Sequence, residues 1–224
     1  MRNATIVFDL DGTLVDTAPD LIGATNHALA SIGVAPVEGA ALRPWISYGA
    51  RRMVEEALAA RGRILDSADV DRLHGIFLDY YERNIATESR PYSGAEAVLA
   101  DLLEGGARLA ICTNKREGLS LALLEALGLS ARFAAVAGRD TFAVHKPHPD
   151  HLIGVIGLAG GEVSRAVMVG DSGVDVEAAR NARVPVVGVT FGYTATPMSA
   201  LGPDALISHY RELPAALARL LARP

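Results

Sequence analysis

The sequence predicts an α/β protein, a doubly wound parallel sheet with a helical segment inserted after the first strand. From Pro91 onward, short apolar runs alternate with helical patterns, which is the order of a parallel sheet with helices on both faces. Residues 16–86 instead have an almost entirely helical pattern. Polar residues gather where the apolar runs end, as at the carboxyl edge of an open α/β sheet.

The first strand is predicted over residues 4–10, because β-branched and aromatic side chains suit a strand buried on both faces. In the helical segment that follows, Thr17 and Asp20 have the spacing of a helix capping box. Two further helices fit residues 50–60 and 69–85, where apolar residues recur at helical spacing.

The second half of the chain supplies the remaining elements. Ser93 and Glu96 again have capping-box spacing, and they open a helix that ends at two glycines, residues 105–106. Strands are expected over residues 108–112, 134–137, 166–169 and 186–189, with an edge strand over 205–208. Helices are expected over residues 117–127, 150–158, 174–182 and 212–222.

These elements predict two domains. Residues 1–15 and 88–224 would form the α/β core, and residues 16–87 a small helical cap inserted into it. The chain has 224 residues, which is enough for one large domain or for a domain with an insertion.

Composition narrows the classes of function. Half of the residues are hydrophobic and the net charge is -5, so we expect a well-packed core and no basic face for nucleic acid. No apolar run is long enough to span a membrane, and no secretory pattern is present. We expect a cytoplasmic protein, monomeric or homodimeric, in which the single cysteine, Cys112, is a buried and inert thiol.

Lysine is rare in this chain. Of the 21 basic residues, only Lys115 and Lys146 are lysines. A compact ammonium group differs in geometry from the planar guanidinium that the chain otherwise uses. Both lysines fall inside segments that also carry other candidate functional residues, which favours a specific role for each.

Two carboxylates end the first strand. Alternate strand residues point the same way, so Asp9 and Asp11 can lie together at the carboxyl end. Carboxylates that close repel each other and require a cation or a shared proton. The pair therefore suits a divalent metal beside a nucleophile.

Other polar residues follow later strands. Thr113 and Asn114 come at the end of residues 108–112, where a hydroxyl can hold a phosphoryl oxygen, although a simple polar turn is the alternative. Lys146 lies in a proline-rich loop and could neutralise a phosphoryl group, or could be an ordinary surface lysine. The nearby histidines 145, 148 and 151 raise the question of zinc, but the prolines preclude a regular ligand face, and we expect solvated loop histidines.

Asp171 and Asp175 form a second acidic pair. Asp171 follows residues 166–169, and Asp175 lies one helical turn later on the same side. Helix capping would explain one of them, but hardly both. Mg²⁺ prefers oxygen ligands and retains several waters, so one or two carboxylates suffice to bind it.

Taken together, these segments resemble the four motifs of the haloacid dehalogenase superfamily of aspartyl-phosphate phosphatases, in the same order and over the whole chain. The first is Asp9-Leu10-Asp11-Gly12-Thr13. The resemblance identifies the insertion as a C1 cap and implies an aspartyl-phosphate on Asp9, with Asp11 as acid and base. It further implies phosphate binding by Thr113, Asn114 and Lys146. The implied cofactor is Mg²⁺, held by Asp9, Asp11 (through its backbone carbonyl), Asp171 and Asp175.

Within the superfamily, the chain is similar to bacterial phosphoglycolate phosphatases. The segments that carry this similarity are Thr113-Asn114-Lys115, Gly170-Asp171-Ser172, Gly192-Tyr193 and residues 45–50. The similarity implies a Mg²⁺-dependent phosphomonoester hydrolase acting on a small phosphorylated metabolite, with 2-phosphoglycolate as the first candidate.

The cap segment departs from the family pattern. The family has a Gly-x-Gly pair in this loop, where Ser47 or Tyr48 stands before Gly49 here, so the substrate is left open. As a hypothesis, Tyr48 and Arg51 (or Arg52) contact the non-phosphate end of the substrate, since arginine can bind a carboxylate in a bidentate way. Solvated arginines at the start of a helix are the alternative.

Three other functions compete. A sugar phosphomutase of the same superfamily would use the same Asp9 and Asp11. A phosphatase could also act on another small phosphoester or on pyrophosphate. A receiver-like signalling domain is disfavoured, because receivers are about half this length and carry their phosphoacceptor on a later strand.

Overall fold

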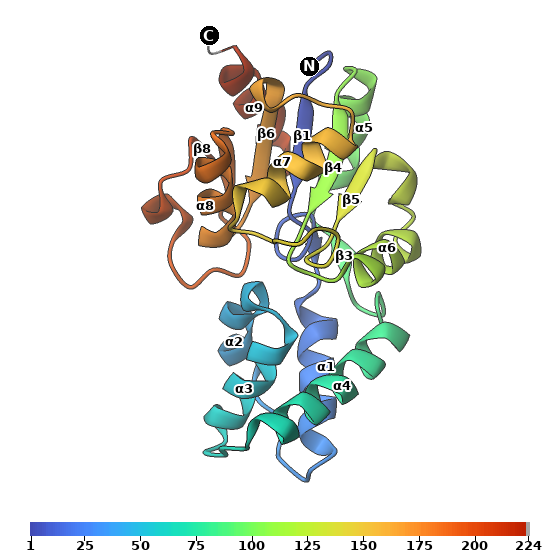
Figure 1. The fold of residues 1–224 in the computed structure, drawn as a ribbon, viewed down its shortest axis with the longest axis vertical. Helices are drawn as coiled ribbons and strands as arrows, with labels where there is room; N and C mark the ends of the chain where they lie inside the picture. Colours follow the sequence, from blue (N-terminus) through green and yellow to red (C-terminus); the bar gives the residue numbers. More distant parts are fainter. Residues whose placement is uncertain (223–224) are drawn as a thin grey trace.

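The computed structural model describes residues 1–222, so the last two residues of the predicted core lie outside it. A parallel sheet occupies one part of the molecule, and a bundle of helices lies beyond one end of its strands (Figure 1). The strand order is β5-β4-β1-β6-β7-β8. The strands are β1 (Thr5–Phe8), β4 (Arg108–Cys112), β5 (Ala135–Ala137), β6 (Ala166–Gly170), β7 (Val186–Val189) and β8 (Ala205–Ile207).

The first strand lies in the middle of the sheet. In parallel register, Thr5 of β1 lies opposite Arg108 of β4 and Ala166 of β6. The chain adds β4 and β5 on one side of β1 and then returns to place β6 on the other side. This reversal next to β1 is the topological switch point at which open α/β sheets bind their ligands.

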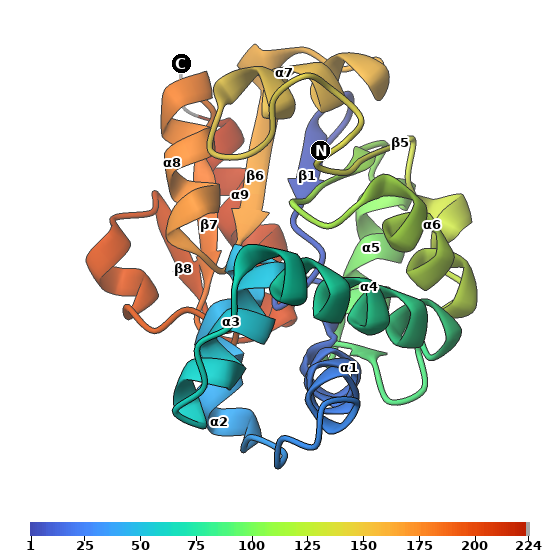
Figure 2. The ribbon, with the colours of Figure 1, turned by 60° about the horizontal axis from the view of Figure 1, so that its bottom comes forward.

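Helices cover both faces of the sheet (Figures 1 and 2). On β1, Ile6 and Phe8 pack in one apolar cluster and Val7 packs in another, as the two-residue period of a strand requires. The first cluster includes α5 (Ala95–Glu104), α6 (Glu117–Ala126) and α9 (Leu213–Leu221), and the second includes α7 (Pro149–Leu158) and α8 (Gly173–Ala182). The predicted fold class is confirmed.

The helical bundle has an apolar core of its own. Its elements are α1 (Ala18–Ala30), α2 (Gly39–Leu42), a 3₁₀ segment (Arg43–Tyr48), α3 (Ala50–Ala60) and α4 (Ser67–Arg83). Among the residues at its centre, Leu29, Leu42 and Leu73 are fully buried. Figure 2 brings this bundle forward, across the end of the sheet to which the strands point.

The two segments of chain that connect the bundle to the sheet are hydrogen-bonded to each other. Strand β2 (Val15–Asp16) pairs antiparallel with β3 (Arg90–Pro91). The N–H of Tyr92 also donates to the carbonyl of Leu14 at 3.0 Å. Because both connecting segments belong to one short two-stranded ribbon, they hold the bundle close to the end of β1.

Most predicted bounds agree with the structure to within two residues, but both predicted capping boxes are wrong. The Thr17 side chain makes no capping hydrogen bond. The carboxylate of Asp20 instead accepts from the N–H groups of Glu88 and Ser89 and from the Ser89 hydroxyl, the last at 2.6 Å. Helix α5 has Gly94 as its N-cap and no side-chain cap.

Two expectations from composition can be compared with the structure. Within residues 1–222, no helix combines the length and apolar character needed to cross a membrane. Cys112 is fully buried, and burial raises the pKa of its thiol to about 12, even though Lys146 acts in the opposite direction. The expectation of a buried, unreactive thiol is confirmed.

Candidate active site

Three of the predicted site residues follow three adjacent strands directly: Thr113 follows β4, Asp9 follows β1, and Asp171 follows β6. The ladder hydrogen bonds continue one step past the strands, since the N–H of Asp9 donates to Val169 at 2.9 Å and that of Thr113 to Ala137 at 3.0 Å. The sheet thus holds these backbones rigidly at its carboxyl edge.

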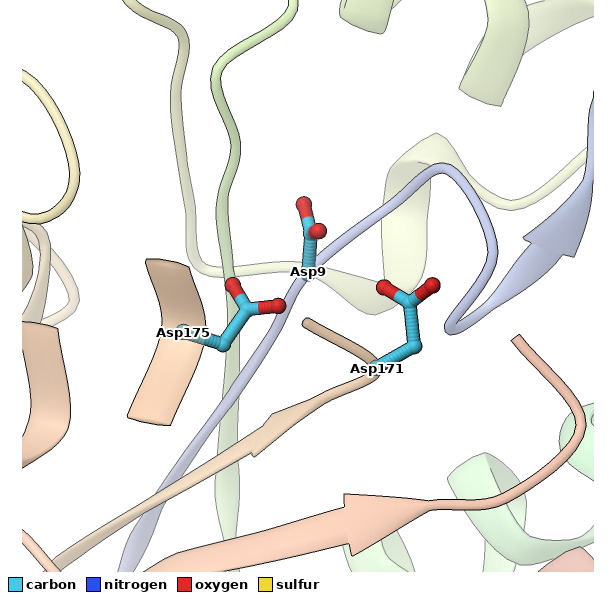
Figure 3. Close-up of side chains that lie close together, drawn as sticks. All are labelled: Asp9, Asp171 and Asp175. Atoms are coloured by element: carbon cyan, nitrogen blue, oxygen red, sulfur yellow. The ribbon is translucent and has the colours of Figure 1, made fainter. Parts of the chain in front are cut away.

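Asp9, Asp171 and Asp175 form a compact carboxylate cluster (Figure 3). Each offers an oxygen that lies within 4.8 Å of those of the other two. Asp171 and Asp175 are fully buried, and Asp9 is 7% exposed. The Asp171 carboxylate accepts from the Tyr193 N–H at 2.8 Å and from the Thr13 hydroxyl at 3.2 Å, and both contacts fix its orientation.

Asp175 belongs both to this cluster and to the start of α8. Its Oδ2 accepts from the Ser172 hydroxyl at 2.6 Å and from the Ser172 N–H at 3.1 Å, which completes a capping box. Its Oδ1 accepts from Lys146 Nζ at 2.6 Å. Helix capping, the alternative considered for this acidic pair, therefore applies to Asp175 and coexists with its place in the cluster.

Lys146 is the cation within the cluster. Its Nζ lies 3.0 Å from Asp9 Oδ1, and its side chain is 2% exposed. Burial alone would lower the pKa of this ammonium, but Asp175 and Asp9 outweigh burial and hold the pKa above its ordinary value. The alternative of an ordinary surface lysine is excluded.

The charges in the cluster do not balance. Burial raises the pKa of Asp9 to about 7, with Asp175 and Asp11 adding to the rise and Lys146 opposing it. Burial, together with Asp175 and Asp9, also raises the pKa of Asp171 well above its ordinary value. Three buried carboxylates against one ammonium favour the binding of another cation, and an all-oxygen donor set fits Mg²⁺.

Two glycines allow the chain to pass close to Asp171. Gly12 has a φ of +81°, and a Cβ there would lie 2.5 Å from Asp171 Oδ2. A Cβ on Gly192 would lie 2.1 Å from the Cβ of Asp171. Side chains at these positions would therefore displace the carboxylate.

Asp11 lies outside the carboxylate cluster and pairs with the other lysine. Lys115 Nζ is 3.1 Å from Asp11 Oδ1 and 3.2 Å from Oδ2. The same ammonium donates to the hydroxyl of Tyr81 at 2.8 Å and lies 4.4 Å from the centre of its ring. Since Tyr81 belongs to α4, this contact joins the bundle to the sheet edge.

The polar turn after β4 is arranged around the two lysines. Thr113 is 2% exposed, and its hydroxyl accepts from the Lys115 N–H at 3.2 Å. The Asn114 side-chain amide donates to the Lys146 carbonyl at 3.0 Å. The Asn114 Oδ1 is buried and has no partner among the residues that the structure describes.

The prediction of solvated loop histidines holds for His145 and His148, which are exposed, and is wrong for His151. His151 is fully buried in α7, where its Nδ1 accepts from the Lys146 N–H at 3.1 Å. Its Nε2 lies 3.0 Å from the carbonyl of Gly138. Burial, together with the charge of Lys146, lowers the pKa of His151 to about 4. A neutral ring therefore fixes the backbone of Lys146.

A cavity of about 550 Å³ lies between the sheet edge and the bundle. Asp9, Asp11 and Thr113 line it from one side, and residues of the bundle line it from the other, including Ile46, Tyr48, Arg51, Met53, Phe77 and Tyr81. The cavity is thus polar beside the strands and largely apolar beneath the helices.

The two residues predicted in the cap lie at this cavity with different surroundings. Tyr48 is 66% exposed. The guanidinium of Arg51 is held by Glu55, by Asp71 at 2.9 Å and by the Ser67 hydroxyl at 3.1 Å. Arg51 therefore already has carboxylate partners within the bundle.

Sequence reasoning missed three residues of this arrangement: Tyr81, Tyr193 as a contact of Asp171, and the buried His151. For Lys115, the scarcity of lysine was a usable signal. For Tyr81, the helical spacing from Phe77 predicts burial, but it carries no information about a lysine elsewhere in the chain.

A family model described as haloacid dehalogenase-like hydrolase matches residues 6–189. A protein of Mesorhizobium japonicum named phosphoglycolate phosphatase is 51% identical over 223 residues, with 100% of this chain and 98% of that protein covered. A protein of the same name from Agrobacterium fabrum is 49% identical, with 94% and 91% covered.

Solved structures agree with these matches. A crystal structure of a predicted phosphoglycolate phosphatase from Haemophilus somnus superposes with a TM-score of 0.89 at 30% identity, covering 96% of this chain and 98% of that one. A structure from Lactobacillus delbrueckii subsp. bulgaricus has a TM-score of 0.83 at 23% identity, with both chains fully covered, and supports the fold alone.

Proposed function

The chain belongs to the haloacid dehalogenase-like hydrolase family, and on that premise we propose that it is a Mg²⁺-dependent phosphomonoesterase whose substrate is 2-phosphoglycolate. The observation that carries the proposal is the position of Asp9. Its carboxylate lies at the switch point of the sheet, beside Lys146 and within the carboxylate cluster. It also faces a cavity large enough for a small ester.

The proposed reaction has two steps at Asp9. Its carboxylate oxygen attacks phosphorus, the bond between phosphorus and the ester oxygen breaks, and Asp11 gives a proton to the departing alkoxide. Asp11 then takes a proton from a water molecule that attacks phosphorus, which releases phosphate and restores Asp9. Lys146 and the Thr113 hydroxyl would hold the transferring phosphoryl oxygens, and Asn114 would hold the Lys146 backbone in place for this task.

The metal site follows from the same residues. Asp9, Asp171 and Asp175, with the backbone carbonyl of Asp11, would hold Mg²⁺. When bound, the ion would neutralise the repulsion between the Asp9 carboxylate and the phosphoryl group. Asp171 and Asp175 would be held for this purpose by Tyr193, Thr13 and Ser172.

Residues 16–87 would act as the cap over a core made of residues 1–15 and 88–224. The apolar cluster of the bundle, in which Tyr193 is the one buried residue contributed by residues 88–222, and the β2–β3 ribbon support this division. A cap that opens and closes on the cavity would exclude water from the ester while Asp9 reacts. The monomeric or homodimeric state and the cytoplasmic location stay predictions.

The proposed substrate derives from the relatives named phosphoglycolate phosphatase. The test is phosphate release from 2-phosphoglycolate and a panel of small phosphoesters and pyrophosphate, in Mg²⁺ or in EDTA, with Asp9→Asn as the blank. We expect Mg²⁺-dependent release led by 2-phosphoglycolate and absent in the variant.

If phosphate is released faster from another ester than from 2-phosphoglycolate, the proposed reaction stands but the proposed substrate is wrong. If no ester released phosphate, the phosphatase proposal would fail. Sugar phosphates should then be tested for isomerisation, which is the reaction expected of a phosphomutase with the same two aspartates.

A further inference from the structure

We propose that Lys115 and Tyr81 bind the carboxylate of the substrate, and so make the site selective for phosphate esters that carry an acidic group beside the ester oxygen. This inference rests on the proposed phosphatase function and deepens it. It assigns the recognition of the non-phosphate end to a pair that bridges the sheet edge and α4, in place of the arginine at the start of α3.

The position of Lys115 follows the geometry of the ester. If phosphorus lies at Asp9 and Lys146, the ester oxygen must lie near Asp11 to receive its proton. In 2-phosphoglycolate, one carbon separates that oxygen from the carboxylate. The carboxylate therefore falls close to Asp11, and the ammonium of Lys115 is 3.1 Å from an Asp11 oxygen.

Tyr81 adds an unused donor at the same place. Its hydroxyl accepts from Lys115, and among residues 1–222 no acceptor is found for its own proton. Tyr81 is 1% exposed and lines the cavity, so a missing partner carries a desolvation cost. A carboxylate oxygen could accept from both the ammonium and this hydroxyl.

The other cations along the cavity are less suited to this role. Arg51 is already paired with two carboxylates, those of Glu55 and Asp71, whereas within residues 1–222 Lys115 pairs with only one, that of Asp11. Arg116 and Arg139 are exposed, and charges in water attract a ligand weakly. Lys115, by contrast, has a side chain that is only 5% exposed, where an ion pair is screened far less.

Lys115 could instead serve only to hold Asp11 in place. The two roles differ in their dependence on the substrate. Holding Asp11 would affect every ester equally, whereas binding a carboxylate would affect only esters that carry one. The ratio of kcat/KM for 2-phosphoglycolate to that for ethyl phosphate, which has a methyl group in place of the carboxylate, separates them.

We expect Lys115→Met to lower this ratio about 10- to 100-fold, the range for losing hydrogen bonds between charged groups. Arg116→Met removes a neighbouring exposed charge and should change the ratio less than about twofold. Tyr81→Phe should lower the ratio in the same direction by a smaller factor, while Tyr80→Phe, the adjacent tyrosine on α4, should leave it unchanged.

An equal loss on both esters in Lys115→Met, or an unchanged ratio in either Lys115→Met or Tyr81→Phe, would overturn the inference while leaving the phosphatase function intact. If Lys115→Met loses all activity, Tyr81→Phe decides the matter. Absence of phosphate release in the unaltered protein would instead be a failure of the proposed function itself.

Discussion

The backbone N–H of Tyr193 donates to the carboxylate of Asp171 at 2.8 Å, while the hydroxyl of the same tyrosine lies at the first residues of the bundle. That hydroxyl accepts from the N–H groups of Thr17 and Ala18 at 2.7 and 2.9 Å and lies 2.7 Å from Asp16 Oδ1. One residue therefore contacts both the carboxylate cluster and the N-terminus of α1.

Tyr193→Phe should destabilise the protein. Removing the hydroxyl leaves the Thr17 N–H without its acceptor and leaves the Ala18 N–H only its longer contact with Asp16 Oδ1, at 3.3 Å. An unsatisfied buried N–H group costs about 1–3 kcal/mol. We expect the free energy of unfolding in urea to fall by about 2 kcal/mol in total. Tyr48→Phe, which removes an exposed hydroxyl, should change it by less than about 0.5 kcal/mol, and equal effects of the two variants would contradict this account.

Gly192→Ala should weaken Mg²⁺ binding. The new Cβ would lie 2.1 Å from the Cβ of Asp171, so either the loop or the carboxylate must move. We expect the Mg²⁺ concentration for half-maximal activity to rise at least about tenfold, which corresponds to about 1.4 kcal/mol.

Gly173→Ala is the matched control, because a Cβ there meets only Leu201, at 3.7 Å. It should bind Mg²⁺ like the unaltered protein. A Gly192→Ala protein with unchanged Mg²⁺ dependence would show that Asp171 tolerates displacement.

Stabilisation by Mg²⁺ should depend on pH. The pKa of Asp9 is raised to about 7 without a bound cation, so the folded protein takes up a proton that the unfolded chain releases near pH 4. Stability from this group is present at low pH and is lost as pH rises from about 4 to 7. A cation in the cluster removes this loss, so Mg²⁺ should stabilise the protein more at pH 8 than at pH 5.

The measurement is the melting temperature with Mg²⁺ minus that with EDTA, at each pH. This subtraction removes the pH dependence that comes from groups the metal does not contact, including the buried His151. In Asp9→Asn, the difference between the two pH values should shrink, and an unchanged difference would show that another group is responsible.

Asp20→Ala should destabilise the junction between α4 and β3. The Asp20 carboxylate accepts hydrogen bonds from three donor groups, the N–H groups of Glu88 and Ser89 and the Ser89 hydroxyl. Their loss from a largely buried position should lower the free energy of unfolding by about 2–3 kcal/mol. Asp71→Ala, on an exposed side chain of α4, should cost less than about 1 kcal/mol, and a comparable loss would contradict the role given to Asp20.

The local patterns in the sequence predicted the elements well. Short apolar runs and helical spacing depend only on neighbouring residues, so residues 50–60 and 186–189 were predicted with the bounds that the structure has. Strand ends could be predicted for the same reason, and they place Asp9 and Asp171 at one edge of the sheet.

Long-range contacts were not predictable from such patterns. Thr17 and Asp20 have the spacing of a capping box, but Asp20 binds Ser89, 69 residues away. Likewise, the Tyr193 hydroxyl meets Thr17 across 176 residues of sequence. These partners depend on how the bundle sits on the sheet, which no local pattern contains.

The central place of β1 has a consequence for synthesis of the chain. Strand β1 emerges first, yet its neighbours β4 and β6 are encoded about 100 and 160 residues later. Helices α1–α4 come from contiguous residues 18–83 and pack on one another, so we expect them to fold on the ribosome while β1 still waits for partners. A nascent chain that ends before Arg108 would carry a folded bundle and an inactive, aggregation-prone β1 with neither of its neighbouring strands.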